Sequence, residues 1–187
     1  MKTRRLFVAL ALLATVPFAP PAPAAANQVS RGSVELSPKF SFTHSNLKRE
    51  GYGNIERATE FTLTPTIGYC ISDHYEVTGG AIVRHFQSGG TNSTNVGVTT
   101  GLIYNFNPKG SLIPYAGAGF GVLFEEGFTF DNTAVLAPDL QVGLRALVGN
   151  AASINMGVGF QHETDGHVHV NRVGAQVGIS VFPWRSK

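Results

Sequence analysis

The sequence predicts an all-β protein, an eight-stranded antiparallel transmembrane β-barrel. Apolar residues recur at every second position in eight separate segments, which is the period of a strand with two unlike faces. Charged residues make up only 14% of the 187 residues, whereas a soluble domain usually carries about a quarter. Beyond residue 26 no run of about 18 apolar residues could form a membrane-spanning helix. Any membrane crossing must therefore be made by strands, and bacterial barrels have an even number of them.

Residues 1–26 have the pattern of an export signal and are excluded from the fold. A basic start over residues 2–5 precedes an apolar run over residues 6–16 and a Pro/Ala stretch that ends at Ala26. The apolar run is shorter than the roughly 20 residues that a spanning helix needs. A retained N-terminal anchor is the alternative. We expect residues 27–187 to form one outer-membrane barrel domain.

The first four strands each combine an apolar face with a face of Gly, Ser, Thr and isolated charges. The third strand alternates less cleanly than the others. The apolar faces consist of Val34, Leu36, Phe40 and Phe42; Phe61, Leu63, Pro65, Ile67, Tyr69 and Ile71; Tyr75, Val77, Ala81 and Val83; and Val96, Val98, Leu102, Tyr104 and Phe106.

The last four strands repeat this pattern, and glycine is especially frequent on the polar face of the fifth. Their apolar faces consist of Ala116, Ala118, Phe120, Val122 and Phe124; Leu136, Leu140, Val142, Leu144 and Val148; Ile154, Met156, Val158 and Phe160; and Val173, Ala175, Val177, Ile179 and Val181.

The polar faces distinguish a membrane barrel from a soluble ligand-carrying barrel, which is the alternative. A soluble barrel would turn its second face to water and carry abundant Lys and Glu there. Here that face is small and carries few charges of both signs, which predicts a crowded interior with paired charges. The interior charges are expected to be Glu35, Lys39, Glu60, Glu76, Arg84, Asp139, Arg145 and Arg172. Aromatic residues near strand ends predict interfacial girdles: Tyr69, Tyr75, Tyr104, Phe106, Tyr115, Phe124, Phe160, Phe182 and Trp184.

The connections are expected to alternate between short and long, as in outer-membrane barrels. Short periplasmic turns are predicted near residues 72–74, 107–110 and 149–151. Long polar loops are predicted on the cell surface at residues 44–58, 87–95, 125–133 and 163–171.

The end of the seventh predicted strand holds the best candidate for chemistry. His162 shares strand parity with Phe160, so it is expected to face outward at the external interface. A histidine of the interfacial belt is the alternative to a catalytic base. Cys70, the one cysteine, cannot form an internal disulfide and is predicted to be a small packed residue of the interior.

Three segments resemble the outer-membrane lipid A 3-O-deacylases, also called acyloxyacyl hydrolases. They are residues 114–122, residues 137–145 and the sequence Phe160-Gln161-His162. In that family the His is followed two positions on by a nucleophilic Ser and then Asn, on the lipid-facing side. An acidic partner usually lies on the last strand. The resemblance therefore implies His162 as general base and Thr164 as nucleophile in an esterase.

The chain departs from the family pattern at two of the three catalytic roles. Thr164 stands where the family has Ser, and Asp165 stands where it has Asn. The last strand offers Asn171 near its external end and no carboxylate, while Glu163 has the inward parity. We expect a structural or interaction role in which polar loops are presented at the cell surface. Lipid A deacylation through His162 is the alternative, and the sequence leaves open whether the chain is an enzyme.

Binding partners follow from the same features. His162, His167 and His169 with Asp165 are close enough in sequence for a metal site, but a solvated loop is favoured, so no metal and no cofactor are predicted. A net charge of +2 gives no reason to expect nucleic acid.

The partners are expected to be outer-membrane lipid, with lipid A implied by the resemblance. The barrel-assembly machinery is a further expected partner, because residues 178–184 resemble an aromatic-ended final strand. The sequence does not indicate a partner for the loops.

Overall fold

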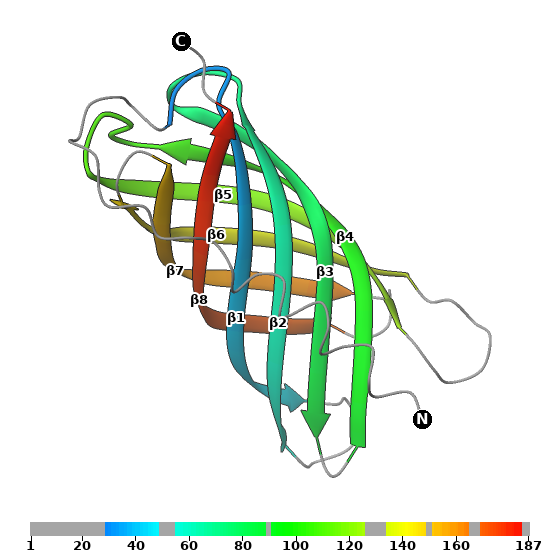
Figure 1. Ribbon diagram of the computed structural model, residues 1–187. Helices are drawn as coiled ribbons and strands as arrows, with labels where there is room; N and C mark the ends of the chain where they lie inside the picture. The colour runs from blue at the N-terminus through cyan, green and yellow to red at the C-terminus, as the bar shows by residue number, and fades with distance from the viewer. Residues whose placement is uncertain are drawn as a thin grey trace, which may run out of the picture.

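The computed structural model is a closed antiparallel barrel in which each strand pairs with its neighbour in sequence and β8 returns to pair with β1 (Figure 1). The described residues are 29–48, 55–88, 91–125, 134–148, 151–164 and 169–184, and the predicted signal peptide lies outside them. Among these residues there is no helix long and apolar enough to cross a membrane. The strands are β1 (Val34–Lys48), β2 (Ile55–Cys70), β3 (Tyr75–Ser88), β4 (Thr91–Asn105), β5 (Leu112–Glu125), β6 (Ala134–Val148), β7 (Ala152–Thr164) and β8 (His169–Trp184). The predicted fold class is confirmed.

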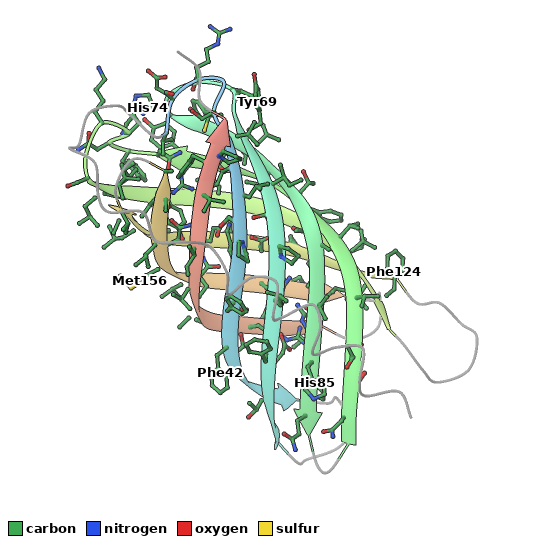
Figure 2. The ribbon with its side chains drawn as sticks, in the orientation of Figure 1. Phe42, Tyr69, His74, His85, Phe124 and Met156 are labelled. Atoms are coloured by element: carbon green, nitrogen blue, oxygen red, sulfur yellow. The ribbon has the colours of Figure 1, made fainter. Side chains whose placement is uncertain are left out.

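The apolar face of each strand points outward and the polar face points into the barrel, as the alternation predicts. Apolar side chains cover the outside; Val142 is 60% exposed and Met156 53% exposed. Figure 2 shows Phe42, Phe124 and Met156 on the outside of the barrel wall. The charged residues Glu35, Glu76 and Arg145 are buried inside. This inverts the ordinary rule for soluble proteins, in which large apolar side chains are buried and charges are exposed.

The strands are longer than the sequence pattern suggests. They contain 13 to 16 residues, whereas a tilted strand needs only about 9–11 to cross a bilayer. The extra residues lie at the end of the barrel where β1, β3, β5 and β7 finish, which we call the loop end. At the opposite, turn end, residues 71–74 and 106–111 connect the strands, and β6 ends at Val148 and β7 begins at Ala152.

The predicted long loops are therefore partly wrong. β1 and β2 stay paired from Lys48 and Ile55 inward, and β3 and β4 from Ser88 and Thr91 inward. Most of the predicted loops 44–58 and 87–95 are thus strand. The reason is that the hydrogen-bonded ladder depends on the backbone and continues into polar sequence after the apolar side chains have ended.

The turn end is closed by the segment that precedes β1. Gly32 has a φ of 84°, in the left-handed region that favours glycine, and its amide donates to the carbonyl of Cys70 at 2.7 Å. This turn places Val29 over the barrel mouth, where it packs with Cys70, Ile113 and Phe182. We call these four residues the plug. The prediction that Cys70 is a packed interior residue is confirmed.

Two of the predicted girdle aromatics are interior residues instead. Tyr115 and Phe182 are 4% and 2% exposed, since each has the inward parity of its strand. The outward aromatics at the turn end do form a cluster: Tyr104 stacks on His74 with ring centroids 5.5 Å apart and meets Phe106 edge-on at 4.9 Å. Tyr69 and His74 lie toward this end in Figure 2, and His85 lies toward the loop end.

Candidate functional site

His162 lies on the outer wall of the barrel near the loop end, as predicted. It is partly exposed, and its main-chain partner on β8 is Asn171. Nδ1 of the imidazole lies 2.7 Å from Oδ1 of Asn171. An amide oxygen only accepts, so this contact makes Nδ1 the protonated nitrogen. This polar pair lies beside two apolar, exposed side chains of the outer wall, Phe160 and Val173.

The pairing between β6 and β7 has a gap directly beside this pair, with the register unchanged across it. The register of β6 and β7 runs from Leu136↔Thr164 to Asp139↔Gln161, which sets Pro138 opposite His162. Neither Pro138 nor its neighbour Ala137 is part of the paired register with β7. Proline has no amide hydrogen, so it cannot donate to a ladder.

The other predicted catalytic residue is placed only in part. The main chain of Thr164 belongs to β7 and pairs with His169, while its side chain lies outside the described residues. Asp165 and His167 also lie outside them. Glu163 has the inward parity expected for it and is buried in the barrel.

The interior charges form two separate clusters, and the first lies near the loop end. It consists of Glu60 on β2, Arg84 on β3, Glu163 on β7 and Arg172 on β8. Arg84 Nε lies 2.9 Å from Glu60 Oε1, and Arg172 Nε lies 2.8 Å from Glu60 Oε2. Both arginines also pair with Glu163. Each Glu therefore bridges both Arg residues, and we call this closed set of four the charge ring.

The second cluster lies nearer the turn end and is also buried. Arg145 on β6 reaches across the barrel to Glu35 on β1 at 2.8 Å and to Glu76 on β3 at 3.2 Å. Its guanidinium carbon lies 5.8 Å from the ring centroid of Phe182, within cation–π range. We call Glu35, Glu76 and Arg145 the floor cluster. Charges buried at this depth are tolerated because they are paired.

The sequence predicted these charged residues to be interior, except Glu163, for which it indicated only an inward parity at the start of a predicted loop, and it did not indicate which of them would pair. The partner that it missed at the outer site is Asn171. The antiparallel register of a short β7–β8 connection would have set His162 and Asn171 opposite each other, and that signal was present in the chain. In the part of the chain that the structure describes, no group of three or more His, Cys, Asp or Glu is placed to hold a metal ion.

Comparisons with known proteins support the fold. No family model matches the chain, and no curated protein matches it significantly. The N-terminal β-barrel domain of Pseudomonas aeruginosa OprF matches with a TM-score of 0.56 and 15% identity, over 81% of this chain and 97% of that one. Neisserial surface protein A matches with a TM-score of 0.62 and 13% identity, over 80% and 96%.

A further solved structure, that of the outer membrane enzyme PagL, matches with a TM-score of 0.48 and 14% identity, over 77% of this chain and 97% of that one. That degree of likeness carries no argument about activity. The chain thus has the fold of small barrels of the outer membrane, and its function has to be inferred from its own side chains.

Proposed function

We propose that this protein is an outer-membrane barrel with a structural or interaction role, which presents its loop end at the cell surface. The observation that carries the proposal is the inversion of the two faces. Apolar side chains such as Phe42, Val98 and Leu140 surround the outside, while the charges lie inside in clusters of ion pairs. A belt of this kind would be an aggregation hazard in water and is stable in lipid.

The polar strand extensions give this barrel a surface for interaction. On the outward face of β3 and β4, beyond the apolar belt, lie His85, Gln87, Asn92 and Thr94. His85 Nδ1 lies 3.1 Å from Thr94 Oγ1. Paired strands hold these polar groups in fixed positions, which suits recognition better than a flexible loop does.

The proposal is tested by locating the protein and by examining lipid A in the same cells. Cells that express this chain are compared with cells that express His162→Ala and Thr164→Ala variants. We expect the protein in the outer-membrane fraction, with heat-modifiable migration, and lipid A of unchanged mass in all three strains. Loss of a hydroxyacyl chain from lipid A in the parent strain alone would contradict a purely structural or interaction role.

The second candidate is a lipid A deacylase, and the contact between His162 and Asn171 favours it. An esterase needs a group that fixes the tautomer of its histidine, and an amide takes this role in some Cys-His-Asn enzymes. Asn171 supplies such a group although no carboxylate is present on the last strand. The outward position of His162 also suits a substrate that lies in the outer leaflet.

In this candidate mechanism Nε2 of His162 would take the hydroxyl proton of Thr164 as the oxygen attacks the ester carbonyl. The proton would pass to the leaving alcohol, and water would then hydrolyse the acyl-enzyme. Asn171→Ala is the informative variant, because it would lower kcat while Asn171→Asp would restore it. If Asn171→Ala left an activity present in the parent unchanged, Asn171 would not orient His162 for catalysis.

A further inference from the structure

The centre of the barrel contains a cavity of about 130 Å³ between the charge ring and the floor cluster. Its wall carries many hydroxyl groups: the inward side chains include Ser41, Thr62, Thr64, Thr66, Thr78 and Thr99. The fixed charges that line its middle, Lys39 and Asp139, are of opposite sign. A polar cavity of this size holds several water molecules, whereas an apolar one would stay dry.

The turn-end side of the cavity is sealed by several layers of side chains. Tyr115 extends from β5 across the neighbouring strands: a Cβ placed on Gly143 would lie 2.6 Å from its ring, and one on Gly157 would lie 3.0 Å from its hydroxyl. Gln176 Nε2 donates to Gln141 Oε1 at 3.0 Å and joins β8 to β6. Below these lie the floor cluster and the apolar plug, whose members are 0–2% exposed.

In the described part of the chain, the loop-end side of the cavity is closed by two groups of side chains. On one side Ile82, Leu123 and Ala137 pack together. On the other side the charge ring spans β7, β8, β2 and β3, and Arg84 also donates to Gln161 Oε1 at 2.6 Å. Glu60, Arg84 and Arg172 themselves line the cavity. Among the residues that the structure describes, the ring is thus a single layer of ion pairs between the cavity and the loop end.

We propose that the cavity is a hydrated chamber for water and small neutral hydrophilic solutes, open only toward the loop end, and that the charge ring is its gate. Neutral solutes fit because Lys39 and Asp139 cancel and the ring itself carries no net charge. The floor cluster, Tyr115 and the plug make the chamber a dead end, so nothing passes through the barrel. The inference depends on the interior alone and does not require either proposed function.

Thiol chemistry tests the gate, because the chain has a single cysteine. Cys70 in the plug reports on the turn end. Ser41→Cys in a Cys70→Ser background reports on the chamber. Each reporter is combined with Arg84→Gln/Glu163→Gln, which removes one acid and one base and leaves Arg172 paired with Glu60. A second ring variant, Glu60→Gln/Arg172→Gln, removes the complementary pair, so that the test stands if one variant fails to fold.

The matched control is His85→Gln, which changes the residue next to Arg84 on the outside of the wall. All proteins are refolded in phospholipid vesicles with a small, uncharged, hydrophilic methanethiosulfonate on both sides, and folding is checked by heat-modifiable migration. In the ring variants the chamber thiol should react at least about tenfold faster than with the ring intact, because modification follows the population of open states. Cys70 should stay unreactive in every folded variant.

Three outcomes would overturn the proposal. Rapid modification of the chamber thiol with the ring intact would mean that the ring closes nothing. Slow modification in both ring variants would assign closure to Ile82, Leu123 and Ala137. Acceleration of Cys70 together with the chamber thiol would mean that the turn end is not sealed.

Discussion

At the scale of single residues, the interior is shaped by glycines that leave room for large neighbours. Gly143 and Gly157 lie on adjacent strands beneath the Tyr115 ring, so the phenol can cross the barrel. Gly159, two residues further along β7, faces open space, since a Cβ there would meet only the Leu140 carbonyl at 3.8 Å. An added methyl group would therefore meet close neighbours at Gly143 and Gly157 but open space at Gly159.

This difference predicts opposite effects of one methyl group. Gly143→Ala should destabilise the barrel by about 1–3 kcal/mol, because the new Cβ would overlap both the Met156 carbonyl oxygen and the Tyr115 ring. Gly159→Ala should be neutral or stabilising by about 0.5–1 kcal/mol, since alanine loses less entropy on folding. Urea titration of both variants in lipid vesicles measures the free energies of unfolding. Equal losses at the two positions would show that the Met156 carbonyl and Tyr115 do not crowd the space beside Gly143.

At the scale of the strand, the outward face changes character along its length. The middle of β6 is apolar at Leu140, Val142 and Leu144, whereas the loop-end extension of β3 carries His85 and Gln87 on the same outward side. The change marks where lipid is expected to end. The backbone ladder between β3 and β4 continues across the boundary to Ser88↔Thr91.

An arginine introduced on each side of the expected lipid boundary tests where that boundary lies. Val142→Arg should destabilise the barrel in lipid by about 2–4 kcal/mol, because its position lies near the middle of the span. Gln87→Arg, also on the outward face, should cost only about 0–1 kcal/mol near the interface. Unfolding titrations in vesicles give both values. A barrel that stands in water would tolerate the two substitutions equally.

At the scale of the whole molecule, the buried charges join strands that are far apart in sequence. Arg145 links β6 to β1 and β3 across the interior, and the charge ring links β7 and β8 to β2 and β3. These contacts form only once the barrel has closed. Closure and charge pairing are therefore expected to be one cooperative event.

Removal of Arg145 alone should be severe. Arg145→Met leaves Glu35 and Glu76 buried without their cation, and breaking a buried pair in this way costs about 3–5 kcal/mol. The triple variant Arg145→Met/Glu35→Gln/Glu76→Gln should recover much of that loss, because no unpaired charge remains. Equilibrium unfolding of the two proteins decides the matter, and a triple variant less stable than the single one would refute the charge-pairing account.

The local pattern determined much of the molecule. Period-two alternation identified eight strands, the direction in which each side chain points, and the interior position of charges such as Glu35, Arg84 and Arg145. It also placed His162 on the outer wall and Cys70 inside, because parity along a strand is a local property. Tyr115 and Phe182 were predicted to belong to the interfacial girdles because they lie near strand ends, although their parity points inward. That prediction was wrong.

Tertiary structure alone decided which of these residues meet. Nothing in the local pattern pairs Glu60 with Arg172, or Arg145 with Glu35, since those contacts depend on closure between β8 and β1. The lengths of the strands were likewise set by pairing between neighbours, which carried β1 to β4 through polar sequence. The alternation of side chains belongs to each strand by itself, whereas register and closure belong to the barrel as a whole, and so the chamber and its charge ring exist only in the folded protein.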